Sequence, residues 1–290
     1  MFGYARGRNR WAPNAMCELL GMSANVPTDI RFSFAGLARR GGGVGPHRDG
    51  WGVAFYEGRA ARAFHDPEPA ASSDIARFLG AHPIRSRTVI AHIRQANRGR
   101  VALANTHPFT RELWGRMWTF AHNGQLRGKK SLPLDFYAPV GETDSEHAFC
   151  WMLDQLRSRF SALPPCRELD GEILQLSTRL ARLGVFNMLL SDSRSLYAFC
   201  GKKLSCLTRR APFGEATLID DDRKVNFAEE TGPGDCVTVV ATGPLTSDET
   251  WTAIKPGALL VLREGRIAAT LFHETPGGQK PSHPIRIPTC

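Results

Sequence analysis

The 290-residue sequence lacks the features of a disulfide-rich, metal-binding or membrane-spanning protein. Its seven cysteines are scattered and odd in number, and they form neither a Cys-x-x-Cys pair nor a Cys/His cluster with zinc-ligand spacing. We therefore expect no disulfide framework, no metal site, and a reducing, cytoplasmic setting. No run approaches the roughly 18 apolar residues that span a bilayer, so we expect no membrane association.

The positive net charge of the chain does not by itself indicate a nucleic-acid partner. The chain carries 37 Lys+Arg against 28 Asp+Glu, a formal net charge of +9. These basic residues are dispersed and no recognition motif accompanies them, so we expect no binding to nucleic acid. With 42% hydrophobic and 22% charged residues, the composition is that of an ordinary globular protein with a sizeable core.

The glycine-rich segment 40–52 lacks what a nucleotide-binding loop needs. A P-loop places Lys-Ser/Thr after its last glycine, and a dinucleotide loop opens a helix, whereas Gly50 is followed by Trp51 and a strand pattern. The His-Arg-Asp triplet at 47–49 matches part of a kinase catalytic loop, but the downstream Asn is missing. We interpret the segment as a loop whose glycines let the backbone approach a ligand or another strand.

Periodicity predicts helices grouped between runs of strands, which is typical of an α+β domain with mostly antiparallel sheets. Helical patterns cover 30–39, 72–79, 145–160 and 170–183. Strand patterns cover 17–23, 51–56, 88–93, 117–121, 185–191, 195–200, 205–209, 236–242, 259–263 and 266–271, with a hairpin signal at 264–265. We expect an N-terminal extension over 1–16, one domain over 17–274, and a proline-rich tail over 275–290.

Polar residues end two predicted strands and open one predicted helix. Arg94 and the pair Asn123-Gly124 follow apolar strand patterns, and Asp144 lies at a helix entry. An Asn-Gly pair alone is a common turn, but together these residues suit an α-amino acid undergoing acyl transfer. Arg94 would hold a carboxylate and Asp144 an ammonium. Asn123 and Gly124 would donate hydrogen bonds to a developing oxyanion.

Cys17, which directly follows Met16, is the candidate nucleophile. If translation starts at Met16, removal of this methionine leaves Cys17 as residue one. Its free α-amine, with a pKa of roughly 7.7–8.0, can then act as base for its own thiol. The other possibility is that residues 1–15 are an arm that is cleaved off. Taken alone, a cysteine in an apolar strand would be an ordinary core residue.

Five segments occur in an order that resembles the class II glutamine amidotransferases, most closely their stand-alone bacterial YafJ-like group. They are Cys-Glu-Leu-Leu-Gly at 17–21, His-Ile-Arg-Gln-Ala-Asn-Arg-Gly at 92–99, Thr-His-Pro-Phe at 106–109, His-Asn-Gly-Gln-Leu at 122–126 and Gly-Glu-Thr-Asp-Ser-Glu at 141–146. Each segment alone is weak evidence, whereas five in order after a Met-Cys start are specific. The similarity continues through 184–192 and 209–213.

The resemblance implies an N-terminal-nucleophile (Ntn) hydrolase fold, a four-layer αββα sandwich of two mostly antiparallel sheets. It implies hydrolysis of the glutamine side-chain amide to glutamate and ammonia through a thioester on Cys17, without a cofactor. By motif position, Arg94 and Asp144 would bind the glutamine α-carboxylate and α-amine, with Asn123 and Gly124 as the oxyanion hole.

The resemblance assigns less to two further residues. His107 and Asn97 would line the substrate pocket. The Asn-Arg pair at 97–98 departs from the Thr-His found there in glucosamine-synthase-type enzymes.

Two other functions remain open from the sequence. The same nucleophile could hydrolyse another γ-glutamyl amide, or the fold could serve as a non-catalytic amino-acid-binding module. Nothing after Glu146 resembles a synthase, isomerase or phosphoribosyltransferase domain. An ammonia acceptor would therefore be a separate enzyme, or the protein would be a free-standing hydrolase.

Overall fold

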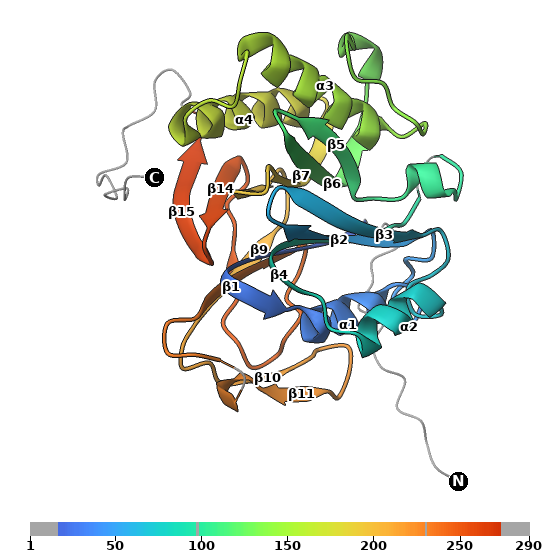
Figure 1. The fold of residues 1–290 in the computed structure, drawn as a ribbon. Coiled ribbons are helices and arrows are strands. Elements are labelled where there is room, and N and C mark those ends of the chain that lie inside the picture. The colour runs from blue at the N-terminus through green and yellow to red at the C-terminus, as the bar shows by residue number, and fades with distance from the viewer. Residues whose placement is uncertain (1–16, 97–98, 230, 274–290) are drawn as a thin grey trace.

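Two antiparallel β-sheets stack face to face between two pairs of helices (Figure 1). The computed structural model describes residues 17–96, 99–229 and 231–273. One helix pair, α1 (Arg31–Arg40) and α2 (Asp74–Ala81), covers the outer face of the first sheet. The other pair, α3 (Asp144–Arg159) and α4 (Cys166–Ala181), covers the second sheet. The predicted α+β class and four-layer αββα sandwich are confirmed.

The first sheet has seven strands in the spatial order β13-β9-β12-β1-β4-β2-β3. They are β1 (Glu18–Asp29), β2 (Trp51–Glu57), β3 (Ala60–Asp66), β4 (Arg85–Ile93), β9 (Ser205–Arg210), β12 (Cys236–Ala241) and β13 (Thr252–Ala253). Side chains alternate across the central strand β1, because successive residues of a strand point to opposite faces. Leu20 and Met22 pack toward α1 and α2, whereas Leu19 packs toward the second sheet.

The second sheet has six strands in the order β15-β14-β8-β7-β6-β5. They are β5 (Phe109–Leu113), β6 (Arg116–Leu126), β7 (Gly184–Ser191), β8 (Leu196–Phe199), β14 (Ala258–Arg263) and β15 (Arg266–Phe272). The predicted hairpin between β14 and β15 is confirmed, with Glu264 and Gly265 both at positive φ. A small ribbon of β10 (Glu215–Thr217) and β11 (Lys224–Asn226) lies outside both sheets.

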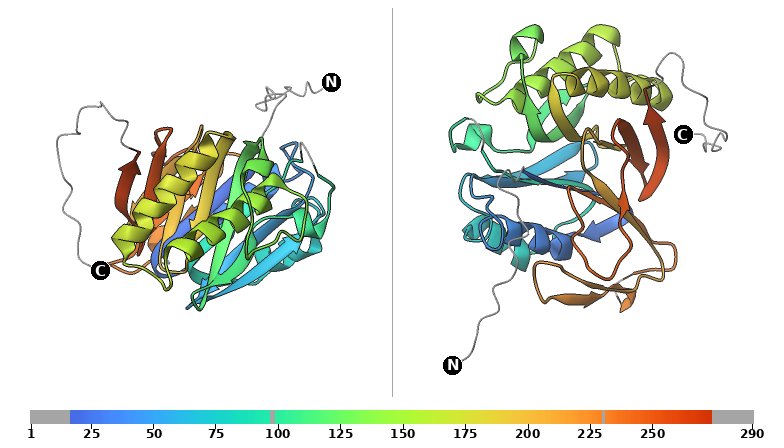
Figure 2. Two further views of the ribbon diagram at one scale, coloured as in Figure 1. Left: turned by 90° about the horizontal axis from the view of Figure 1, so that it is seen from above. Right: turned by 180° about the vertical axis from the view of Figure 1, so that it is seen from behind.

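Three hydrophobic cores hold the four layers together. The first joins α1 and α2 to the first sheet through residues such as Leu37 and Trp51. The second lies between the sheets and includes Ile90 and Leu189. The third joins α3 and α4 to the second sheet around Trp151. Figure 2 shows α3 and α4 lying side by side over the sheet when viewed from above.

Local sequence signals explain where the helices begin. The Ser73 hydroxyl caps α2 by accepting a 3.2 Å hydrogen bond from the Ala76 N–H. The Thr143 hydroxyl caps α3 by accepting a 3.1 Å hydrogen bond from the Glu146 N–H. Acidic side chains in the first turn of α3 complement the positive end of its dipole. Asp144, at the first helical position, is thereby fixed at the edge of the second sheet.

The structure corrects several predicted boundaries. Strand β6 spans Arg116–Leu126 rather than 117–121, and it runs through Asn123 and Gly124, so this pair forms no turn. Strand β1 extends to Asp29, and α4 begins at Cys166 rather than near 170. Strands β3, β5, β10, β11 and β13 were not predicted. They lie at sheet edges or in the two-stranded ribbon and bury few side chains, so their apolar pattern is weak.

Two predictions of organisation lie outside the described residues, namely the extension over 1–16 and the tail over 275–290. No helix among the described residues is long and apolar enough to cross a membrane.

Candidate active site

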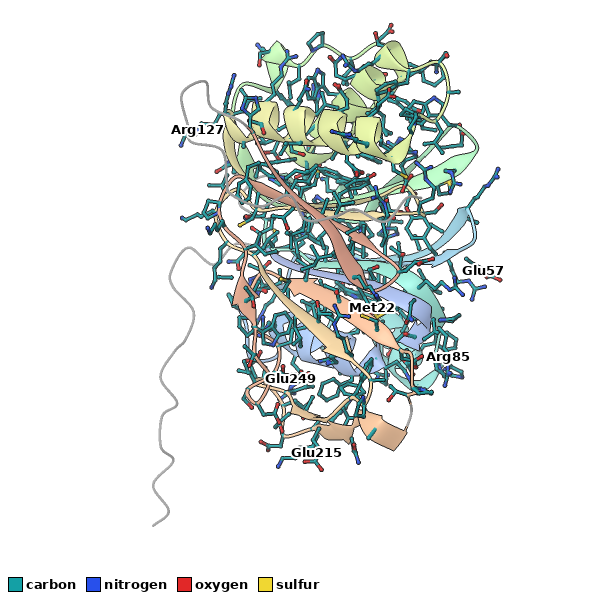
Figure 3. All side chains as sticks on the ribbon, turned by 90° about the vertical axis from the view of Figure 1, so that its left-hand side faces the viewer. Met22, Glu57, Arg85, Arg127, Glu215 and Glu249 are labelled. Carbon is teal, nitrogen blue, oxygen red and sulfur yellow. The ribbon has the colours of Figure 1, made fainter. Side chains whose placement is uncertain are left out.

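A cavity of about 490 Å³ opens at one end of the sandwich, where β1, β4, β6 and α3 meet. Its lining includes five of the predicted site residues: Cys17, Arg94, His107, Gly124 and Asp144. Asn123 lies directly behind Cys17, and Asn97 lies outside the described residues. Arg127 marks this end of the molecule, and Glu57 and Arg85 mark the opposite end (Figure 3). The structure therefore brings together residues that are separated by more than a hundred positions in the sequence.

Cys17 precedes β1 and contacts the segment that follows β4. Its thiol donates to the Gln95 carbonyl, and Sγ accepts from the Gln95 N–H, each at 3.3 Å. Burial raises the pKa of the Cys17 thiol to about 11, against smaller lowering effects of the Gln95 backbone and the Arg94 charge. The thiol is therefore protonated at neutral pH, and a nearby base is required to make it a nucleophile.

The strand that follows Cys17 is anchored by a buried ion-pair network. Arg40 contacts Glu18 at 3.2 Å and Asp220 at 2.7 Å. The Leu19 N–H donates to the Thr242 hydroxyl at 2.9 Å. These contacts join β1 to the end of α1 and to two distant loops, so they fix the backbone immediately after the cysteine.

Asn123 and Gly124 lie on β6 against the start of β1. The fully buried Asn123 side chain donates from Nδ2 to the Cys17 carbonyl and, at 3.1 Å, to the Thr242 hydroxyl. Gly124 has φ of +152°, and a Cβ at this position would lie 1.8 Å from the Val185 carbonyl oxygen. Only glycine fits there, because β7 approaches β6 so closely.

Arg94 is buried immediately after β4 and lies beside the glycine-rich loop. Its Nη1 donates to the Asp49 carbonyl at 3.3 Å and to the Arg100 carbonyl at 3.1 Å. The predicted close approach of a glycine in this segment to another part of the backbone is seen at Gly52, the second residue of β2. A Cβ on Gly52 would lie 2.3 Å from the His107 carbonyl oxygen.

Asp144 faces the end of β6 from the first turn of α3. Its Oδ2 accepts a 2.6 Å hydrogen bond from the Leu126 N–H, and Oδ1 accepts one from the Ser145 N–H at 3.0 Å. A carboxylate has further lone pairs, so Asp144 can still accept from an ammonium in the cavity. The helix start and the strand end together fix its orientation.

Two buried histidines, His107 and His122, line the cavity, and a third, His92, packs against His107. His107 stacks against His92 with ring centroids 4.2 Å apart, and neither ring nitrogen of His107 has a hydrogen-bond partner among the described residues. His122 shares hydrogen bonds with the Ser145 hydroxyl and the Val185 carbonyl. Burial lowers the pKa of all three, to about 3 for His92. These imidazoles are therefore uncharged at neutral pH and add no positive charge to the site.

These histidines predict a loss of stability in acid. In the unfolded chain their pKa values return to about 6.5, so below that pH the unfolded state binds more protons than the folded state. The free energy of unfolding then falls with decreasing pH, by up to about 1.4 kcal/mol per unit for each imidazole. Urea denaturation between pH 7 and pH 5 measures this loss. The dependence of the free energy of unfolding on pH should be weaker in His92→Gln than in the wild type. It should stay unchanged in the control His82→Gln, at an exposed position. Equal stability of the wild type at both pH values contradicts the account.

Sequence reasoning missed the parts of the site that depend on backbone contacts. The two Gln95 main-chain groups hold the thiol, and the Leu126 N–H orients Asp144. Backbone groups carry no residue-type signal, so no motif identifies them. In the described part of the chain, no three His, Cys, Asp or Glu side chains lie close enough to hold a metal ion.

Comparison with known proteins identifies the family. The model of the class II glutamine amidotransferases matches residues 16–285. The chain belongs to this family. The sequence is 60% identical over 243 residues to YafJ from Escherichia coli K12, whose name assigns it to the glutamine amidotransferases; the match covers 83% of this chain and 95% of YafJ. The resemblance to the YafJ-like group is thus confirmed.

Solved structures agree with this membership of the class II glutamine amidotransferases. The crystal structure titled as a predicted glutamine amidotransferase from Pseudomonas aeruginosa superimposes with a TM-score of 0.70 at 49% identity, covering 87% of this chain and all of that one.

A shorter sequence match, 35% identical over 77 residues, links the chain to the γ-glutamyl-hercynylcysteine sulfoxide hydrolase of Mycobacterium tuberculosis. It covers 26% of this chain and 31% of that protein.

Proposed function

We propose that the protein hydrolyses the side-chain amide of L-glutamine to glutamate and ammonia through a thioester on Cys17. One observation carries this proposal: a single cavity joins a half-buried thiol, a buried arginine and a helix-start aspartate. The thiol suits attack on an amide carbonyl, and the two charged groups suit the two charged ends of an α-amino acid. Membership of the class II family supports the same chemistry.

The reaction starts with transfer of the thiol proton to the Cys17 α-amine. This route requires Cys17 to be the first residue of the working enzyme, so we propose that residues 1–16 are absent from it. The thiolate attacks the amide carbon, and the protonated amine then delivers its proton to the leaving ammonia. Water hydrolyses the resulting thioester to glutamate, which regenerates the thiol.

The oxyanion that forms during attack is assigned to the Asn123 Nδ2 and the Gly124 N–H. Asn123 already donates to the Cys17 carbonyl, which supports a role for its amide beside the reacting residue. Both Nδ2 protons are engaged, by the Cys17 carbonyl and the Thr242 hydroxyl. Binding the oxyanion therefore requires exchange of one of these hydrogen bonds, and losing such a donor typically costs about 3–4 kcal/mol in the barrier.

The charged ends of the substrate are assigned to Arg94 for the α-carboxylate and Asp144 for the α-amine. His107 presents an imidazole without an internal partner to the same cavity, which supports a hydrogen bond from this residue to the substrate. Asn97 is proposed to line the pocket on the strength of its motif position alone. The scattered cysteines support a cytoplasmic setting, and the ammonia acceptor is proposed to be a separate enzyme.

Conservative substitution of the two charged residues tests the proposal. We expect Arg94→Lys and Asp144→Asn each to raise the KM for glutamine at least tenfold, because both remove charge-assisted hydrogen bonds to the substrate ends. Arg62→Lys, at the far end of the sandwich beside Glu57, is the matched control. Glutamate and ammonia are measured together. Unchanged KM values in both variants would exclude these roles.

A γ-glutamyl amide other than glutamine is the second candidate substrate. The 77-residue match to the γ-glutamyl-hercynylcysteine sulfoxide hydrolase favours it. The same nucleophile and charged residues would serve, and only the leaving amine would differ. Comparing kcat/KM for glutamine with that for γ-glutamyl anilides separates the two, since the better substrate identifies the leaving group that the pocket accepts.

A further inference from the structure

The glycine-rich loop has no chemical role in the proposed reaction, yet it contacts the substrate-binding segment directly. Strands β2 and β4 end their pairing at Trp51 and Ile93. Hydrogen bonds between the two backbones continue beyond this pair. The Arg94 N–H donates to the Gly50 carbonyl at 2.8 Å, and the Asp49 N–H donates to the Arg94 carbonyl at 3.2 Å. Gly50 has φ of +107°, a backbone conformation that residues other than glycine rarely adopt. The loop is therefore shaped to follow the chain beyond β4.

Asp49 makes the contacts that end this pairing. Its carboxylate Oδ2 accepts a 2.7 Å hydrogen bond from the Ala96 N–H, and its carbonyl accepts the 3.3 Å hydrogen bond from the Arg94 guanidinium. One residue thus contacts the Arg94 main chain, the Arg94 head group and the residue two positions further on. Between these contacts lies Gln95, whose main chain holds the Cys17 thiol.

We propose that Asp49 is a positioning residue that holds the 94–96 segment, and with it the Arg94 guanidinium, in the geometry that binds the substrate carboxylate. The proposal rests on the function assigned to Arg94 above. The carboxylate is needed as a hydrogen-bond acceptor and not as a base, because its partner is a backbone N–H. An asparagine side chain offers the same acceptor oxygen, whereas alanine offers none.

Loss of the carboxylate should affect binding more than folding. The Ala96 N–H would lose its acceptor, and the segment that carries Arg94 would be held by fewer contacts. Displacement of a binding group by about 1 Å costs up to about a hundredfold in rate. We expect Asp49→Ala to raise the KM for glutamine at least tenfold and Asp49→Asn to stay within about threefold of the wild type. Arg48→Ala, at the exposed neighbouring position, is the control.

Two readouts test the proposal, the first on the full-length chain and the second on protein that begins at Cys17. Deuterium uptake of the peptide containing 94–96 should rise in Asp49→Ala, but not in Asp49→Asn or Arg48→Ala. On protein beginning at Cys17, labelling by 6-diazo-5-oxo-norleucine should slow at least tenfold in Asp49→Ala. Alkylation by iodoacetamide, which has no α-carboxylate, should change less than threefold.

The outcomes separate this proposal from the proposed function. Unchanged deuterium uptake in Asp49→Ala, or equal slowing of both reagents, overturns the positioning role. Failure of the wild type to hydrolyse any γ-glutamyl amide overturns the function itself, whatever Asp49 does. Equal KM values for Asp49→Ala and the wild type, on an active enzyme, also contradict the proposal.

Discussion

Cys17→Ala and Cys17→Ser should both abolish the release of ammonia from glutamine, with activity falling by about 10⁴-fold or more. Alanine removes the nucleophile. Serine keeps the α-amine and places an oxygen where the sulfur was, but the site holds sulfur through two 3.3 Å contacts to Gln95. A hydroxyl is also a far weaker nucleophile than a thiol at neutral pH. Steady-state assays that measure glutamate and ammonia together check this result.

The matched control is Cys200→Ala. Cys200 also carries a free thiol, but it is buried between the sheets and its sulfur donates to the Ile254 carbonyl at 3.3 Å. Its removal leaves a small cavity and should cost stability without changing kcat. Comparable losses of activity in the Cys17 and Cys200 variants would contradict the assignment of Cys17 as the nucleophile.

An intact peptide bond before Cys17 should reduce activity by at least about a hundredfold, which is the lower range of what a general base contributes. An acylated nitrogen has no basic lone pair, and burial holds the pKa of the thiol at about 11. At pH 8 the thiolate fraction is then about a hundredfold below that of a thiol with a pKa of 9. No other group among the described residues hydrogen-bonds to this sulfur and can act as base.

Two forms of the chain measure this effect. One form keeps residues 1–16 because the peptide bond before Cys17 is protected from proteolysis. The other form is cleaved at that bond so that it begins at Cys17. The cleaved form should show glutaminase activity that rises with pH as the α-amine loses its proton, with a midpoint near pH 8. Equal activity of the two forms would exclude the α-amine as the base.

The sequence predicts the layered fold because local signals and global packing agree over most of it. The caps at Ser73 and Thr143 start helices where the hydroxyl pattern indicates. The alternation within β1 and β4 supplies side chains to two cores. Five motif positions meet at one cavity because they lie at strand ends and a helix start, which the sandwich gathers at one end.

The remaining features depend on contacts between distant segments. The Asn-Gly pair at 123–124 is locally a turn signal, but pairing of β6 with β7 keeps it in a strand. The support from Asp49 to Ala96 joins a loop to a strand end 47 positions away. At least one partner in each of these contacts is a backbone group, which is the same in every residue, so the residue pattern could not indicate them.

The most direct test is peptide mapping by mass spectrometry after the reaction of 6-diazo-5-oxo-norleucine with active enzyme purified from its native host. We predict one adduct per chain, on a peptide whose first residue is Cys17 and whose α-amine is free. An adduct on another residue, or an active enzyme in which Met1–Ala15 is still attached to Cys17 through Met16, would contradict the account.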